Sequence, residues 1–378
     1  MKCLFVAAND HYHGKGGGGT AVRALKARFD DVLGVENVEL YCFDEWGRTL
    51  PRRVKQVYSI WKSLFSTLPS RSIFVLPTNA QRQLSEKIAT AQPDFVVING
   101  GDVWSVIEAL PERLPAILIA HNIEHRLMRS HIDQLTGLEA FLRPILSRDV
   151  NKLHSLEVAA AKRACNILSI SEEDADYFRN LGDNMNVATF LQTFNYQPYT
   201  RTERPHNRPL NVGFMAKMTW WPNQEGAAWF VDKVLANLGP SQVVGHFYGA
   251  GSEAFDGRLP NLVTHGFVDA LDDIWKNCDL MICPILSGSG VNIKFVEALF
   301  NRMPVLATTL AARGLPTIED EHVVYLDQPS EWIDFLLSPK AQELASGSIS
   351  TRVVDLFRPE SQSQHIADFL SSVMTENR

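Results

Sequence analysis

DLMICPILSGSGVNIKFVEALFNRMPVLAT, residues 279–308, carries the clearest fold signal in this chain. Two apolar runs without polar alternation, 279–285 and 304–307, are typical of strands buried on both faces of a sheet. Between them a glycine turn leads into a helix-length segment, in which Ile293, Val296 and Phe300 recur at helical spacing. This order predicts two parallel strands joined by a right-handed crossover.

Similar apolar runs of strand length occur on both sides of this unit and alternate with helix-length segments. They lie at 2–8, 38–43, 95–99, 116–120 and 166–170 in the first half, and at 210–215, 243–248 and 262–265 in the second. Each half therefore has its own set of strands. We expect an α/β protein with two doubly wound parallel-sheet domains.

The composition fits this expectation. Hydrophobic residues make up 45% and charged residues 21% of 378 positions, which excludes extensive disorder, and the net charge of −7 disfavours duplex nucleic acid as a partner. No apolar run approaches the roughly 20 residues of a membrane span, and the initial MKCLFVAAND is interpreted as a strand, not a signal peptide. The five scattered cysteines, without a CxxC pair, indicate reduced thiols in a cytoplasmic protein.

The predicted domain boundaries follow from changes in composition. Residues 1–195 form the first domain and 210–358 the second, and the Pro- and Arg-rich stretch 196–209 is the predicted linker. Residues 359–378 end the chain with apolar side chains at helical spacing, so this helix could pack back on the N-terminal domain or on the other one.

In the second half, the candidate binding residues follow predicted strands. Gly288 and Gly290 form the turn within 279–308, and Lys294 and Glu297 stand three residues apart on the helix behind it. A cation and a carboxylate beside a helix N-terminus can hold a diphosphate and a pair of sugar hydroxyls; the alternative is a surface salt bridge. Lys217 lies in the turn after 210–215, before a helix with Asn223 as its expected N-cap.

In the first half, glycines follow the first predicted strand. Gly14 and 16–19 precede a helix expected to start near Thr20, where the backbone can approach a substrate and the helix dipole favours an anion. A flexible turn is the alternative. The basic segment 46–76 contains six Lys or Arg residues and several aromatic side chains, and it has no acidic residue. It is therefore either a membrane-facing surface or a solvated helix covering the sheet.

Two other patterns resemble metal sites. His121 to His125 reads H-x-x-E-H, a zinc peptidase pattern, but His121 closes a predicted strand, so we interpret it as lining a cleft or as a structural histidine. Asp174 and Asp176 form a D-x-D string, but Ser171 precedes it as the first residue of a capping box. We interpret the string as a helix start and expect no metal.

The second half resembles the retaining glycosyltransferases of family four, also called glycosyl transferases group 1, which have the GT-B fold. The resemblance rests on GFMAKMTWWPNQEGAAWF, HGFVDALDDIW, CPILSGSGVNIKFVEAL and PVLATTLAARGLP, and continues weakly through the glycine turn, AHNIEH and LSISEEDADYF. It implies two Rossmann-like domains facing across a cleft, with the nucleotide sugar on the C-terminal domain and the acceptor on the N-terminal one.

The resemblance also implies residue roles. Glu297 matches the glutamate that holds the donor ribose, Gly290 the turn that approaches the donor, and Phe267 and Val268 the grip on the nucleobase. His121 matches the strand-end histidine that faces the reacting sugar, which is the catalytic role predicted for it. Gly16, Gly17 and Gly18 would lie near the diphosphate or the acceptor.

Two positions depart from the family pattern. Ser289 stands where the earlier of two paired glutamates is expected, so the resemblance assigns no sugar-recognising residue there. The Arg and Lys pair expected after the first strand of the second domain is missing, which leaves Lys217 and Lys294 as the candidates for binding the diphosphate.

From these observations we expect a cytoplasmic glycosyltransferase of polysaccharide biosynthesis, without a cofactor or metal. It would move a sugar from a nucleoside diphosphate to a glycan or lipid-linked glycan, with retention of anomeric configuration. No metal is needed if lysines and helix dipoles stabilise the departing diphosphate. A peripheral membrane contact through 46–76 is part of this expectation. The alternatives are an epimerase-like enzyme of the same fold and a non-catalytic nucleotide-sugar binding module.

Overall fold

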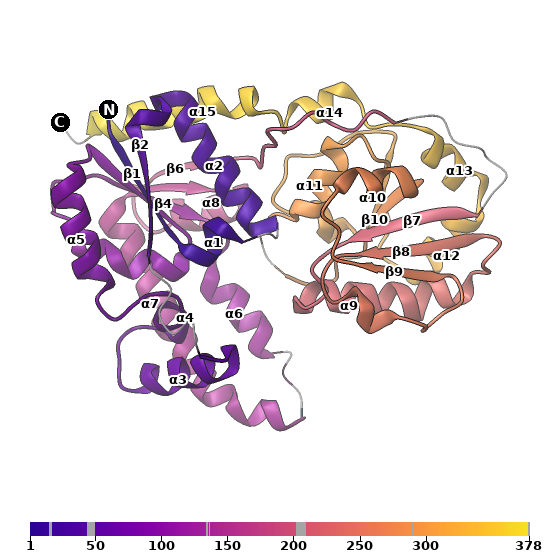
Figure 1. The fold of residues 1–378 in the computed structure, drawn as a ribbon, viewed down its shortest axis with the longest axis horizontal. Helices are drawn as coiled ribbons and strands as arrows, with labels where there is room; N and C mark the ends of the chain where they lie inside the picture. Colours follow the sequence, from indigo (N-terminus) through magenta and orange to yellow (C-terminus); the bar gives the residue numbers. More distant parts are fainter. Residues whose placement is uncertain are drawn as a thin grey trace. The chain divides into compact units, whose positions relative to one another are not determined.

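The computed structural model describes residues 1–14, 17–43, 50–133, 135, 137–201, 209–288 and 290–376. The chain divides into two compact units (Figure 1). Unit 1 contains Met1–Thr193 together with Pro359–Arg378, and unit 2 contains Phe194–Arg358. Of the predicted linker, 202–208 lies outside the described residues.

Unit 1 is built on a six-stranded parallel sheet in the order β2-β1-β3-β4-β5-β6. Its strands are β1 (Cys3–Ala8), β2 (Val38–Phe43), β3 (Phe95–Asn99), β4 (Ala116–Ala120), β5 (Asn166–Ser169) and β6 (Asn186–Thr189). Every residue of β1, β3 and β4 is buried, because helices cover both faces of the sheet.

The helices of unit 1 form two layers. One face is covered by α2 (Gly17–Leu33) and α15 (Pro359–Glu376), which run side by side (Figure 1). The other face is packed by α5 (Ala80–Ala91), the 3-10 segment η2 (Gly101–Ala109), α7 (Arg143–Ala164) and α8 (Glu172–Arg179). The remaining helices are α1 (Asn9–His13), α3 (Arg52–Leu64), α4 (Ser70–Val75), α6 (Glu124–Asp133) and the 3-10 segment η3 (Gly137–Leu142).

Unit 2 has a second six-stranded parallel sheet, in the order β12-β11-β10-β7-β8-β9. Its strands are β7 (Leu210–Met215), β8 (Val243–Tyr248), β9 (Leu262–Gly266), β10 (Leu280–Cys283), β11 (Val305–Ala307) and β12 (Val323–Tyr325). One core joins the sheet to α9 (Trp221–Trp229), the following π-helical turn (Phe230–Val234), α12 (Pro329–Leu337) and α13 (Pro339–Ser346). The other core joins it to α10 (Leu271–Asn277), α11 (Ile293–Phe300) and α14 (Thr351–Asp355).

The two parallel α/β sheets confirm the predicted fold class. The strands 38–43, 95–99, 116–120, 210–215 and 243–248 have the predicted bounds, and the other predicted strands differ by one or two positions at an end. Two edge strands, β6 and β12, were not predicted. Each has only three or four residues, and these are half-buried. Neither strand therefore has the long apolar run that marks a buried strand.

Three local predictions are corrected by the structure. Helix α2 begins at Gly17, not near Thr20, so Gly17 and Gly18 lie in its first turn; Gly16 is outside the described residues. Helix α9 begins at Trp221 after Trp220, so Asn223 is not its N-cap. Asn223 is instead buried in the first turn and donates to the carbonyl of Lys217 over 2.9 Å.

Helix α15 packs on α2 within unit 1. Its side chains Ile366, Phe369, Leu370 and Val373 are buried in the same core as Val22, Leu25 and Phe29 of α2. Among the described residues, no helix combines the length and apolar character of a membrane span.

Candidate functional site

The sheet of unit 2 reverses its strand order between β7 and β10. From β7 the chain adds β8 and β9 on one side, and then returns to add β10, β11 and β12 on the other. In open parallel sheets, ligands bind beyond the carboxyl ends of the strands at such a switch point. The segments that follow β7 and β10 therefore define the candidate site, and they contain Lys217 and the turn 284–292.

The turn 284–292 is held in shape by side chains from outside it. The Thr308 hydroxyl donates to the carbonyl of Ile285 over 2.6 Å, and Arg313 Nη1 donates to the carbonyl of Gly288 over 2.9 Å. Gly288 and Gly290 have φ angles of 120° and 70°, which a side chain would disfavour. Ser289, between them, lies outside the described residues.

Lys294 lies in the first turn of α11 and is partly buried. Its Nζ donates to Asn292 Oδ1 at 2.8 Å, directly before the helix. Burial lowers the pKa of Lys294 to about 8, with the thiol of Cys283 acting in the opposite direction. The structure thus places the amino group of Lys294 at the end of the glycine turn.

Glu297, one turn further along α11, is half-buried. Tyr196 donates its hydroxyl hydrogen to Glu297 Oε1 over 3.1 Å, and that hydroxyl accepts from Asn301 Nδ2 over 3.0 Å. Burial raises the pKa of Glu297 to about 7, against the hydrogen bond from Tyr196. Lys294 and Glu297 have separate partners, so the alternative of a surface salt bridge between them is wrong.

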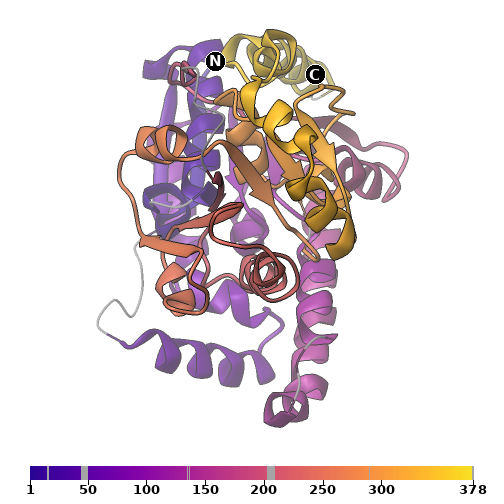
Figure 2. The same ribbon diagram turned by 90° about the vertical axis from the view of Figure 1, so that its right-hand side faces the viewer.

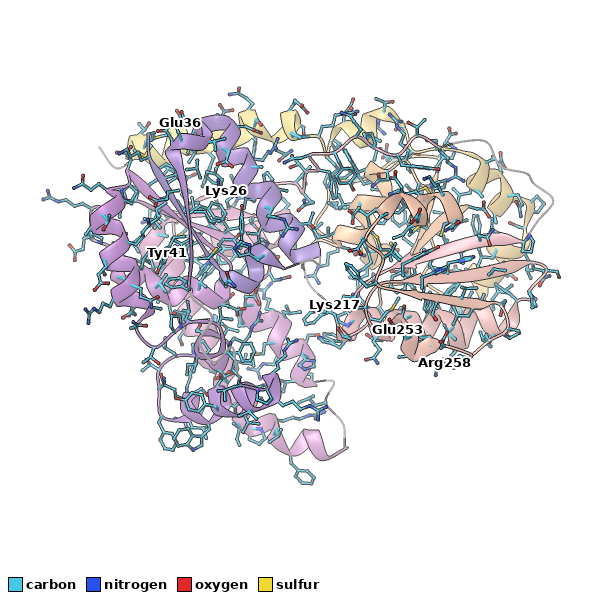
Figure 3. The ribbon with its side chains drawn as sticks, viewed as in Figure 1. Lys26, Glu36, Tyr41, Lys217, Glu253 and Arg258 are labelled. Atoms are coloured by element: carbon cyan, nitrogen blue, oxygen red, sulfur yellow. The ribbon has the colours of Figure 1, made fainter. Side chains whose placement is uncertain are left out.

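The other predicted donor residues lie at strand ends of the same sheet. Lys217 is exposed beyond β7 (Figure 3), and Phe267, directly after β9, exposes 52% of its surface. Val268 is half-buried against the core that contains α11. Beside them, His265 stacks on Tyr248 with ring centroids 4.2 Å apart, an aromatic platform that the sequence analysis did not single out.

In unit 1, His121 directly follows β4. Its Nε2 lies 3.0 Å from Oδ1 of Asn99, the last residue of the neighbouring strand β3. Both side chains are therefore at the carboxyl edge of this sheet. The next titratable groups belong to a separate, buried network: Arg71 contacts Asp102 at 2.8 Å and Glu124 at 2.6 Å.

This network explains the H-x-x-E-H pattern without zinc. Glu157 accepts hydrogen bonds from the backbone of Glu124 and from His125 Nδ1, at 2.7 and 2.6 Å. Burial raises the pKa of Glu124, although its partner Arg71 acts in the opposite direction. Glu124 and His125 thus have structural partners of their own, separate from His121. Within the described ranges, no three His, Cys, Asp or Glu side chains are grouped as a metal site.

The D-x-D string begins a helix, as predicted. The Ser171 side chain accepts from the backbone of Asp174 over 3.2 Å as the N-cap of α8, and Asp176 pairs with Arg179 at 2.7 Å. Arg23 Nη1, on α2, donates to the carbonyls of Tyr12 and Gly14.

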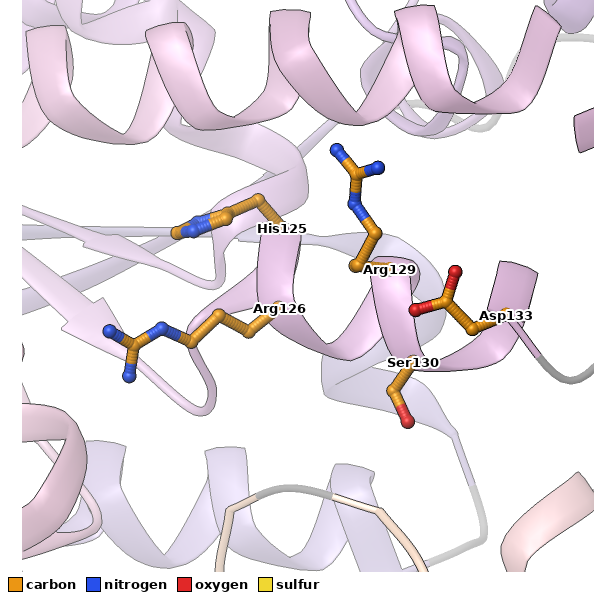
Figure 4. Close-up of a pocket in the computed structure, with 5 residues that line it drawn as sticks. All are labelled: His125, Arg126, Arg129, Ser130 and Asp133. Atoms are coloured by element: carbon orange, nitrogen blue, oxygen red, sulfur yellow. The ribbon is translucent and has the colours of Figure 1, made fainter. Parts of the chain in front are cut away.

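A pocket of about 610 Å³ lies along α6, and the sequence analysis did not predict it. Figure 4 shows its lining side chains His125, Arg126, Arg129, Ser130 and Asp133 along one helix. Arg126 lies over the ring of Tyr177 at 4.8 Å, and Arg129 donates to Asn151 over 3.3 Å. In the sequence, the two arginines stand three residues apart directly after AHNIEH. This spacing was the signal from which the pocket could have been predicted.

Comparison with known proteins agrees with this geometry. Residues 209–339, which contain the candidate donor residues of unit 2, match the family model described as glycosyl transferases group 1. The matched range is about a third of the chain. A curated relative, an uncharacterized 44.6 kDa protein in the cps region of Klebsiella pneumoniae, is 28% identical to 132 residues of the chain. The match covers 32% of this chain and 34%, about a third, of that relative.

Solved structures share the fold over the whole chain. TarM superposes with a TM-score of 0.67 at 11% identity, covering 98% of both chains. Sucrose-phosphate synthase from Thermosynechococcus elongatus gives 0.69 at 12% identity, covering both chains completely. Anabaena Alr3699/HepE, in complex with UDP and glucose, gives 0.62 at 16% identity, with 98% of this chain and 100% of that one covered. The chain therefore has the GT-B fold, with one α/β unit in each half.

Proposed function

We propose that the protein is a glycosyltransferase that moves a sugar from a nucleoside-diphosphate sugar to a hydroxyl of a glycan or lipid-linked glycan, with retention. The observation that carries this proposal is the pair of Lys294 and Glu297 on α11, beside the glycine turn of the group 1 domain. Lys294 supplies a cation for the diphosphate, and Glu297 supplies carboxylate oxygens that accept from the ribose hydroxyls.

We assign the donor and the acceptor to different units. Unit 2 holds the donor, with Phe267 and Val268 at the base and Lys217 as a second cation. Unit 1 receives the acceptor at the carboxyl edge of its sheet, where His121 lies, and His121 keeps the catalytic role that the family resemblance implies. Departure of the diphosphate is stabilised by the lysines and the N-terminus of α11, so no metal takes part.

The relatives favour a particular donor and pathway class. HepE structures contain UDP and UDP-glucose, so a uridine donor is the first to test. The cps-region relative supports a role in polysaccharide biosynthesis. A thermal-shift screen of UDP, GDP, ADP and their sugar conjugates tests the donor site, because ligand at 100 times its Kd adds about 2.7 kcal/mol of stability. Product NMR then tests retention.

A turnover assay with and without an acceptor, run beside the binding screen, separates the two alternatives. An epimerase-like enzyme would convert the sugar nucleotide or release free sugar without an acceptor. A binding module would be stabilised by the nucleoside diphosphate and show no turnover with any acceptor. Donor consumption that requires an acceptor supports the transferase, and stabilisation by none of the nucleotides contradicts the proposed donor site.

We further propose that unit 1 contacts the cytoplasmic membrane face through α3. This helix is amphipathic, but it buries polar side chains and exposes apolar ones. Its buried side chains are Lys55, Ser59 and Ser63. Its exposed stripe consists of apolar and aromatic side chains, namely Val54, Val57, Tyr58, Trp61 and Phe65, the last two exposing 57% and 78% of their surface. Exposed apolar surface of this extent indicates an interaction site.

The surroundings of α3 fit an anionic lipid surface. Arg52 and Arg53 are exposed at its first turn, and Lys62 is half-exposed at its last. The start of α7, with η3 before it, lies at the same end of unit 1 as α3 in both views (Figures 1 and 2). This segment also has exposed apolar side chains, namely Phe141, Leu142 and Ile145. Lys152 Nζ, on α7, donates to the carbonyl of Ser66 over 2.8 Å and fixes this helix beside the end of α3.

A further inference from the structure

Helix α9 packs unusually closely on the turn that follows β10. A Cβ atom at Gly226 would lie 1.9 Å from the carbonyl oxygen of Pro284, so only glycine allows this approach. Pro222, in the first turn of the same helix, lies within 3.7 Å of the Cβ position of Gly288. The first two turns of α9 are therefore fixed against the segment 284–288.

This packing places a carboxylate over the glycine turn. Glu225 precedes Gly226, is exposed, and accepts a hydrogen bond through Oε2 from the hydroxyl of Ser287. Helix α9 follows β7 and Ser287 follows β10, so this hydrogen bond crosses the switch point of the sheet. On the other side of the turn, Arg313 holds the carbonyl of Gly288.

The hydrogen bond shows what this position can recognise. Ser287 presents an alcohol hydroxyl to Glu225, and a sugar hydroxyl is the same donor chemistry. A carboxylate has two oxygens that can accept from neighbouring hydroxyls, and such charge-assisted bonds are stronger than neutral ones. The same carboxylate repels an anionic sugar. Glu297 has a different partner, because it accepts from the hydroxyl of Tyr196.

We propose that Glu225 determines donor specificity by accepting hydrogen bonds from hydroxyls of the donor sugar, which replace the hydroxyl of Ser287. The substrate class is a nucleoside diphosphate carrying a neutral, hydroxylated hexose, and uronic acid donors are excluded. This inference rests on the proposed function, and it assigns sugar recognition to α9 in a chain whose glycine turn has Ser289 at the position of the family glutamate.

Calorimetric titration of UDP, UDP-glucose and UDP-glucuronate into wild type and three variants tests the assignment. In Glu225→Gln, binding of UDP-glucose should weaken about ten-fold, binding of UDP should change less than about two-fold, and discrimination against UDP-glucuronate should shrink. Asp232→Asn is the matched control, because it removes another exposed carboxylate about two turns further along. It should bind all three ligands as wild type does.

Ser287→Ala distinguishes recognition from bracing. If Glu225 binds the sugar, loss of its serine partner leaves the carboxylate available, and UDP-glucose affinity stays within about two-fold of wild type. Equal losses in Ser287→Ala and Glu225→Gln would show that the pair only braces the turn, and equal weakening of UDP and UDP-glucose would likewise overturn the proposal. If no nucleotide binds wild type, the donor site itself is contradicted and the inference falls with it.

Discussion

The hydroxyl of Tyr196 lies 3.1 Å from Glu297 Oε1, although the two residues are 101 positions apart in the sequence. Tyr196 belongs to the segment that enters unit 2, and its ring packs edge-on against Phe300 of α11. The entering chain thus fixes the orientation of the carboxylate to which we assign the ribose. Among the described residues Oε2 has no donor, which leaves it available to a ligand hydroxyl.

Changing Glu297 to Gln should weaken nucleoside diphosphate binding by about ten-fold or more, because the amide keeps one acceptor oxygen and loses the charge. At pH 5, where the folded protein keeps Glu297 protonated, the melting temperature of the unliganded protein should change little, since Tyr196 can still donate to the amide oxygen. Calorimetry and thermal melts measure the two quantities. Equal dissociation constants in wild type and variant would remove Glu297 from the donor site.

The raised pKa of Glu297 predicts a pH dependence of stability. With a pKa of about 7 in the folded state and about 4.3 in the unfolded one, the unfolded chain releases this proton first as pH rises. The contribution of Glu297 to stability is therefore largest below about pH 4 and decreases until about pH 7. Wild type should lose about 2–3 kcal/mol relative to Glu297→Gln between pH 5 and 7, measured by urea unfolding. A constant difference would contradict this.

Nucleotide binding should show the opposite trend. Ribose hydroxyls donate to the ionised carboxylate, so affinity should increase as pH rises through about 7, and Glu297→Gln should abolish most of this increase. Titrations at pH 6 and pH 8 measure it. An identical pH profile in the variant would assign the effect to another group.

Sugar transfer should survive EDTA, because lysines and the α11 N-terminus are proposed to stabilise the diphosphate. Asp174 and Asp176 are engaged in starting α8, which supports this expectation. The assay compares rates before and after chelation, with a stronger zinc chelator in a parallel sample. Loss of activity with rescue by Mn²⁺ would contradict metal-independent transfer.

Because α3 exposes apolar side chains beside basic ones, we expect the protein to bind anionic vesicles in a salt-sensitive way. Arg52→Glu with Arg53→Glu should abolish cosedimentation, and Trp61→Ser with Phe65→Ser should weaken it at any salt concentration. Lys55 is unsuitable for this test, because it is buried with Nζ over the ring of Phe74 at 4.6 Å. Arg82→Glu, which changes an exposed charge on α5, is the control. Equal binding by all four proteins would remove the membrane role.

The sequence predicted the sheets well because buried parallel strands leave continuous apolar runs, as in 95–99 and 116–120. Helix ends were harder, since Trp220 and Gly17 carry no capping signature. The site was predictable where one segment contains it, as with Lys294 and Glu297. Tyr196, Glu225 and Ser287 were not singled out, because their contacts join distant segments and only the fold brings them together.

The position of α15 has a consequence for synthesis of the protein. Unit 2 is continuous in the chain and can fold as soon as its last residue leaves the ribosome, whereas unit 1 needs Ile366 and Phe369 to cover the apolar face of α2. Until those residues emerge, Val22, Leu25 and Phe29 lack part of their core. The first unit to be translated is thus the last to be completed, and its uncovered face is the surface that a chaperone would protect during translation.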